Sequence, residues 1–194
     1  AAILSLIQHK KASILSTTPH VIYELNKYPD IVKQLRLLIS GGDKLKSIHV
    51  TQLIGKVDIY NTYGPTESTV CATYHKVTSL EDVHLIGKPI DNRQIYILNQ
   101  LGHIQPIGLE GELCIGGEGT ARGYLDETQN KYSFKPDPFY PGKMIYCTGD
   151  RALWNEDGTI EFINRIDHQV KIRGHRIEMH EIEKCISQFQ NISD

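Results

Sequence analysis

Residues 61–69, Asn-Thr-Tyr-Gly-Pro-Thr-Glu-Ser-Thr, gather side chains that could bind a nucleotide. The Gly-Pro step forces a turn, and the turn would present Tyr63, Thr66 and Glu67 together. An aromatic ring can stack on a base, a threonine hydroxyl can donate to a phosphate oxygen, and a carboxylate can hold Mg²⁺. Taken alone, the segment is better explained as an ordinary Asn/Gly/Pro turn, so other parts of the sequence must decide.

Strands and helices alternate in the first third of the sequence, where they would position this loop. Short aliphatic runs predict strands, and the segments with helical spacing between them predict helices. We expect strands at 12–15, 35–39 and 57–60 and helices at 19–28 and 43–55. Such alternation favours βα units and a largely parallel sheet. Ligands of parallel α/β sheets bind beyond the carboxyl ends of the strands, where residues 61–69 would lie.

The sequence after residue 70 predicts hairpins or a barrel-like sheet, followed by a new packing unit. Short β-rich segments are expected at 70–75, 94–98, 112–115 and 159–163. Asp157-Gly158 is a strong hairpin signal. Residues 170–173 alternate, Gly174 breaks the pattern, and 179–189 has helical spacing. The glycines of 111–125 lack the spacing of a nucleotide fingerprint, so we interpret them as structural.

The composition argues against several classes of function. Among 194 residues, 21 Lys and Arg against 23 Asp and Glu give a net charge of -2, without the basic excess typical of nucleic-acid binding. No apolar run approaches the roughly 20 residues that cross a bilayer. Four scattered cysteines do not suggest a zinc site and suit a reducing, cytoplasmic location. Without an initiator Met or a basic leader, the sequence is expected to be an internal piece of a longer chain.

Five sequence blocks in a fixed order resemble the adenylate-forming superfamily, most closely the adenylation domains of nonribosomal peptide synthetases. They are residues 37–43, 61–69, 111–125, 146–150 and 164–176. Pro65 favours the synthetase pattern over that of acyl-CoA ligases. The resemblance implies an α/β fold that is a fragment of the adenylate-forming enzyme fold. Its βα units of a mostly parallel sheet would precede a β-rich, barrel-like part and the start of a small α+β subdomain.

The resemblance also implies an activity and its participants. Similar domains use ATP and Mg²⁺ to form an aminoacyl-adenylate, then pass the acyl group to the phosphopantetheine thiol of a carrier-protein domain. Thr66 and Glu67 would be the catalytic residues, with Glu67 as the Mg²⁺ ligand. The residues implied for nucleotide binding are Asn61, Tyr63, Ile86, Asp150, Phe162 and Arg165. Tyr63 and Ile86 would cover the two faces of adenine, and Asp150 would hold the ribose.

A hinge at Asp167 would divide a large subdomain (1–166) from the start of a small one (167–194). Lys171, Arg173 and Gly174 would face the pantetheine arm. The alternative for this basic stretch is a solvated strand edge. Asn164 replaces a glycine typical of the block.

Six positions match the family's side-chain pocket: Ser16, Ile39, Gly41, Thr62, Val70 and Cys71. Small and apolar residues without an acid or base describe a roomy neutral pocket. An aromatic or large neutral amino acid would fit it best. Each of these residues could equally serve core packing.

The resemblance leaves rival functions open. The family's phosphate loop would precede Ala1 and its adenylation lysine would follow Asp194, so the 194 residues alone are not expected to adenylate. A related carboxylate ligase is the first alternative: a D-alanine carrier-protein ligase or an acyl-CoA synthetase. A non-catalytic binding or scaffolding piece is the second. Neither nucleic acid nor a membrane is an expected partner.

Overall fold

The computed structural model describes residues 2–167, 169–172 and 174–189. Within them the helices are α1 (Ala2–Lys10), α2 (Pro19–Leu25), α3 (Pro29–Val32), α4 (Ser47–Val50), the 3₁₀ helix η1 (Thr66–Ser68), α5 (Glu127–Ser133) and α6 (Met179–Ile186). The strands are β1 (Ile14–Thr17), β2 (Leu37–Ser40), β3 (Asp58–Tyr63), β4 (Thr73–Val77), β5 (Leu85–Pro89), β6 (Arg93–Leu98), β7 (Gly111–Gly117), β8 (Phe134–Pro136), β9 (Met144–Trp154), β10 (Ile160–Arg165), β11 (Val170–Ile172) and β12 (His175–Ile177).

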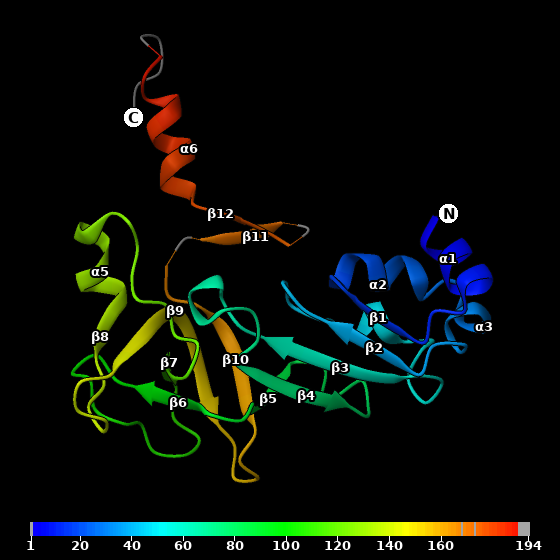
Figure 1. Cartoon of the computed structure of the whole chain (residues 1–194), viewed down its shortest axis with the longest axis horizontal. Helices are drawn as coiled ribbons and strands as arrows, with labels where there is room; N and C mark the ends of the chain where they lie inside the picture. Colours follow the sequence, from blue (N-terminus) through cyan, green and yellow to red (C-terminus); the bar gives the residue numbers. More distant parts are fainter. Residues whose placement is uncertain (1, 168, 173, 190–194) are drawn as a thin grey trace.

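The expected βα units form the first part of the large sheet. Strands β1, β2 and β3 pair in parallel, and the first four helices gather beside them (Figure 1). Ile22, Leu38 and Ile59 are almost completely buried between these helices and strands. Because parallel strands end at one edge, the loops after β2 and β3 come together there.

Two predicted helices are shorter than expected. The helix predicted at 19–28 ends at Leu25, because Pro29 disfavours helical backbone at Tyr28, which has φ -131° and ψ 55°. The helix predicted at 43–55 is reduced to α4. The Asp43 carboxylate accepts from the Lys44 N–H at 2.7 Å, and the helix begins only at Ser47. The residues after Gly42 are therefore a loop beside the end of β3.

The β-rich part is antiparallel, as the sequence predicts. The strands run in the order β4-β5-β10-β9-β7-β6, with β8 also paired to β9. In the residues described this order is an open path, so the part is an open sheet rather than a closed barrel. Gly158, at φ +75°, makes the predicted hairpin turn between β9 and β10. A second core around Ile97, Leu113 and Ile160 holds these strands together.

The last described segment does not pair with the large sheet. Strands β11 and β12 pair as a separate hairpin and α6 follows them, above the end of β10 in Figure 1. The predicted helix at 179–189 is thus confirmed over Met179–Ile186. The division of the chain at Asp167 stays a prediction. Among the described residues, no helix combines the length and apolarity needed to cross a membrane.

Candidate functional site

A cleft of about 300 Å³ lies where the ends of β2 and β3 face β9 and β10. All six residues that the resemblance implies for nucleotide binding line it: Asn61, Tyr63, Ile86, Asp150, Phe162 and Arg165. These residues lie up to 104 positions apart in sequence, and the sheet order brings them to one place. The structure therefore assembles this group as predicted, although it does not test their roles.

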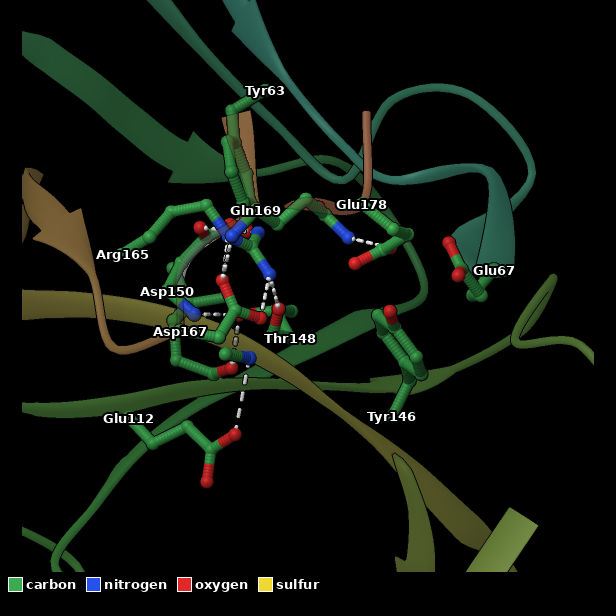
Figure 2. Close-up of polar contacts among 12 residues, drawn as sticks. Tyr63, Glu67, Glu112, Tyr146, Thr148, Asp150, Arg165, Asp167, Gln169 and Glu178 are labelled. Carbon is green, nitrogen blue, oxygen red and sulfur yellow. Dashed lines mark hydrogen bonds and ion pairs between the residues drawn. The ribbon is translucent and has the colours of Figure 1, made fainter. Parts of the chain in front are cut away.

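Asp150 is the buried polar centre of the cleft. The Tyr63 hydroxyl donates to its Oδ2 at 2.5 Å, and Arg165 Nη1 donates to its Oδ1 at 2.8 Å (Figure 2). Burial, followed by the nearby Asp150 charge, raises the pKa of Tyr63 well above its usual value. The phenol is consequently a neutral donor, and the positive charge of Arg165 compensates the carboxylate.

Local backbone geometry presents Asp150 to the cleft. Strand β9 is irregularly paired with β7 around Gly149, which has φ +70°, a value that glycine adopts easily. Thr148 Oγ1 accepts from the Asp150 N–H at 3.0 Å and donates to the Leu113 carbonyl at 2.8 Å. These bonds fix the irregularity and direct the Asp150 side chain towards Tyr63.

The walls of the cleft are largely aromatic and aliphatic. The Tyr63 and Phe162 rings have centroids 6.4 Å apart, and Lys44 Nζ lies 5.4 Å from the Phe162 centroid. Ile86 is 5% exposed, and it packs in the same cluster as these two rings. The Asn61 amide donates to the carbonyls of Val83 and Leu85, so it secures the segment that carries Ile86.

Thr66 and Glu67 lie outside this cleft. They form η1 directly after the Gly-Pro turn, with Thr66 exposed and Glu67 buried. Glu67 Oε1 accepts from the Tyr124 hydroxyl at 2.6 Å. One oriented carboxylate fits the donor set of Mg²⁺, which takes one or two protein carboxylates together with substrate phosphates.

Tyr124 is a site residue that sequence reasoning missed. It belongs to residues 111–125, which we interpreted as structural because of their glycines. Burial, with its hydrogen bond to Glu67 as the next cause, raises the pKa of Tyr124. The only signal in the sequence was a tyrosine just after Gly123 in a family block, and its partner lies 57 positions away.

The six predicted pocket positions lie along one sheet face and the loop after it, not in one enclosed cavity. Ser16 and Ile39 are register partners on β1 and β2, and of the six only Thr62 lines the cleft. A Cβ added to Gly41 would lie 2.8 Å from Thr62 Oγ1, so a larger residue would have to displace this hydroxyl. Val70 is 74% exposed, and Cys71 is half-buried.

The predicted hinge begins with a carboxylate that binds the same arginine as Asp150. Asp167 accepts from Arg165 Nε at 2.6 Å and Nη2 at 2.5 Å. Gly174 has φ +83°, and a Cβ there would lie 2.9 Å from Thr18 Cγ2. Lys171 lies in β11, but its side chain is outside the described part of the chain, and Arg173 is wholly outside it.

Comparison with known proteins shows which family the chain belongs to. The family model named AMP-binding enzyme matches residues 1–125, more than half of the chain. The chain belongs to the AMP-binding enzyme family. Its enzymes form adenylates, and the similarity to peptide-synthetase members inferred from the sequence blocks is confirmed by the relatives.

This AMP-binding chain is similar to two synthetases and to one solved structure. It is 46% identical to bacitracin synthase 2 of Bacillus licheniformis over 95% of its own length. It is 43% identical to surfactin synthase subunit 1 of Bacillus subtilis over 100% of its length. The structure of PA1221, an NRPS protein containing adenylation and PCP domains, superposes with a TM-score of 0.89 at 32% identity over 99% of the chain.

These relatives are much longer than this AMP-binding chain. It covers 7% of bacitracin synthase 2, 6% of surfactin synthase subunit 1 and 41% of the PA1221 chain. The family and the fold are therefore established, whereas the substrate, partners and complete reaction remain to be proposed.

Proposed function

We propose that the chain provides the nucleotide-binding part of an amino-acid-activating adenylation domain in a nonribosomal peptide synthetase. The observation that carries the proposal is the convergence of six residues from distant strands and loops on one cleft around Asp150. The similarity to bacitracin and surfactin synthases supports a peptide synthetase over a D-alanine or acyl-CoA ligase.

In the proposed binding mode, the aromatic part of the cleft holds adenine and its polar part holds ribose. Tyr63 and Phe162 would flank the base, with Ile86 closing the apolar wall. One carboxylate can accept from both ribose hydroxyls, and two donors, Tyr63 and Arg165, orient Asp150 for that role. Arg165 would supply positive charge beside the ribose and the α-phosphate.

In the proposed reaction, an amino-acid carboxylate oxygen attacks the α-phosphorus of ATP and pyrophosphate leaves. The thiol of a carrier-protein phosphopantetheine arm then attacks the acyl carbon, and AMP leaves. Bound Mg²⁺ would offset negative charge on the phosphates, with Glu67 as its protein ligand. The chain's own residues bind and orient the nucleotide, and Tyr124 holds the Glu67 carboxylate in place.

The amino acid is proposed to be aromatic or large and neutral. The positions at Ser16, Ile39, Gly41, Thr62, Val70 and Cys71 carry no acidic or basic side chain. A charged substrate side chain would therefore lack a counter-charge among them.

Amino-acid-dependent ATP–pyrophosphate exchange tests this proposal in the intact protein that carries the chain. We expect phenylalanine, tyrosine or tryptophan to give the highest exchange in a panel that includes D-alanine and fatty acids. Asp150→Asn should weaken nucleotide binding about 10-fold or more, because a charge-assisted hydrogen bond contributes about 1.5–3 kcal/mol. Asp30→Asn, in an exposed pair with Lys33, is the matched control.

Other results would contradict the assignment in distinguishable ways. Exchange with fatty acids alone would indicate an acyl-CoA ligase, and exchange with D-alanine alone would indicate a carrier-protein D-alanine ligase. Nucleotide binding that ignores both Asp150→Asn and Glu67→Gln would indicate a scaffold. Full exchange by the isolated 194 residues would refute the expectation that they do not adenylate alone.

A further inference from the structure

Two buried cysteines face each other on neighbouring strands. Cys114 in β7 and Cys147 in β9 are register partners, and their Sγ atoms are 3.4 Å apart. Cys114 is fully buried in a small apolar cluster with Tyr96, Leu98 and Ile145. The proposed reaction uses neither thiol.

The two thiols differ in access. Cys147 lines a second cavity, of about 550 Å³, that also borders Arg165 and Asp167. Cys114 is 0% exposed, and Cys147 is 7% exposed. A small solute entering this cavity would therefore reach Cys147 first.

The two thiols also differ in acidity. Cys114 donates its S–H to Cys147 Sγ, and this hydrogen bond lowers the pKa of Cys147. The same bond, followed by burial, raises the pKa of Cys114. A thiol that lines a cavity and has a lowered pKa, beside a neighbour whose pKa is raised, resembles the arrangement of redox-sensing cysteine pairs.

We propose that Cys147 and Cys114 form a reversible oxidation site that reacts with hydrogen peroxide and closes to an intramolecular disulfide. The Cys147 thiolate attacks one peroxide oxygen, the O–O bond breaks, and hydroxide leaves as water after taking a proton. The resulting sulfenic acid is attacked by the Cys114 sulfur. The S–O bond then breaks and a second water leaves with the Cys114 proton. Two thiols are oxidised and one peroxide is reduced.

The strand geometry permits this bond with only a small movement of the backbone. Directly opposed residues in antiparallel strands have Cα atoms about 4.5–5.5 Å apart, within the range of about 4.4–6.8 Å that disulfides span. Rotation of the side chains, together with a slight approach of β7 and β9, would shorten the present 3.4 Å separation to the bonding distance of about 2.05 Å.

A metal site is the competing use of the same atoms. The Glu112 carboxylate and both sulfurs lie within 4.8 Å of one another. Two thiolates on one tetrahedral zinc ion, each about 2.3 Å from it, would stand about 3.8 Å apart, farther than these do. Glu112 Oε1 also already accepts from the Gly149 N–H at 3.1 Å. The geometry thus favours the thiol pair.

Oxidation is expected to affect the nucleotide cleft, a consequence that rests on the proposed function. Cys147 immediately precedes Thr148, Gly149 and Asp150, and these residues are held to β7 through Leu113 and Glu112. Joining β7 to β9 at this point would shift the support of Asp150. Nucleotide binding should then weaken in the oxidised protein and recover after reduction.

The test treats the intact protein that carries the chain with hydrogen peroxide and counts thiols in these 194 residues by peptide mass spectrometry. We expect free thiols to fall from four to two, with a Cys114–Cys147 disulfide that dithiothreitol reverses. Cys147→Ser should abolish the product, and Cys114→Ser should leave a sulfenic acid that dimedone traps. Cys71→Ser and Cys185→Ser are the matched controls and should change nothing.

Several outcomes would overturn the inference. Oxidation of Cys71 or Cys185 while Cys114 and Cys147 stay reduced would do so, and so would stoichiometric zinc that shields the pair. Because the wild-type measurement needs no substitution, a variant that fails to fold does not decide the question. A disulfide without any change in nucleotide affinity would refute only the coupling. A protein that forms the disulfide but binds no nucleotide in either state would refute the proposed function instead.

Discussion

At the scale of single residues, each of the two carboxylates proposed to act on ATP is held by a tyrosine hydroxyl. Tyr63 donates to Asp150 at 2.5 Å and Tyr124 donates to Glu67 at 2.6 Å. Burial is the first cause that raises the pKa of each phenol, so both remain protonated donors. A neutral donor orients a carboxylate without cancelling its charge, which at Glu67 leaves that charge available to a cation.

Tyr124→Phe tests this arrangement at Glu67. Removing the hydroxyl should raise the apparent KM for Mg²⁺ about 5-fold, since a lost hydrogen bond costs about 1 kcal/mol. The kcat at saturating Mg²⁺ should change little, because Tyr124 is proposed to position Glu67 and not to touch ATP. Steady-state exchange over a Mg²⁺ titration measures both quantities. Tyr28→Phe, at an exposed tyrosine, is the control, and a lower kcat with an unchanged KM for Mg²⁺ would contradict the role.

Residue types and order predicted much of the candidate site. Tyr63, Asp150 and Arg165 were recognisable because each belongs to a characteristic block of sequence. Tyr124 was not, because its importance comes from a hydrogen bond across 57 positions that only the folded chain creates. The contact between Cys114 and Cys147 could not be predicted either, because the positions of scattered cysteines in a sequence do not reveal the register of the strands.

At the scale of elements, Gly87 allows β4 and β5 to approach closely beside the wall that is proposed to hold adenine. It has φ +77°, and an added Cβ would lie 1.9 Å from the Tyr74 carbonyl oxygen. Gly87→Ala should therefore lower the free energy of unfolding by more than about 2 kcal/mol, through both a clash and left-handed strain. Chemical denaturation measures this loss.

Gly55→Ala separates the clash from the backbone strain, the two causes of the stability loss expected for Gly87→Ala. Gly55 has nearly the same φ, +76°, but nothing lies within 4 Å of an added Cβ. This variant should lose only the strain of about 1–2 kcal/mol. Equal losses in both variants would show that the backbone contact at Gly87 does not matter.

The sequence predicted best those elements whose residue pattern matches their surroundings in the folded chain. The aliphatic runs near β2 and β3 are typical of buried parallel strands, and Asp157-Gly158 is typical of a hairpin turn. The helix predicted at 43–55 was wrong in extent, since the structure has helical residues only over Ser47–Val50 of that range. Pairing with β7, β8 and β10 extends β9 to eleven residues, well beyond what its own sequence indicates.

At the scale of the whole molecule, Arg165 joins the large sheet to the segment that follows it. Its guanidinium donates to Asp150 and the Thr148 carbonyl in the sheet, and to Asp167 at the predicted hinge. Beyond Asp167, the Gln169 side chain donates to Glu178, which precedes α6. A nucleotide that engages Asp150 and Arg165 would therefore alter the bonds that hold β11, β12 and α6 near the cleft.

Asp167→Ala tests whether this link restrains the last segment. The Asp167 carboxylate also accepts from the Gln169 N–H at 3.1 Å, so its loss removes an arginine partner and a backbone acceptor together. A half-exposed ion pair of this kind contributes about 1 kcal/mol, which corresponds to roughly 5-fold faster hydrogen exchange at Gln169. Exchange at Leu38, in the core of the sheet, should stay unchanged. The control Asp30→Ala removes an exposed carboxylate elsewhere and should leave Gln169 exchange as it was. If Gln169 exchanges at the wild-type rate in Asp167→Ala, the hydrogen bonds of Asp167 do not restrain the segment, and nucleotide binding cannot release it through them.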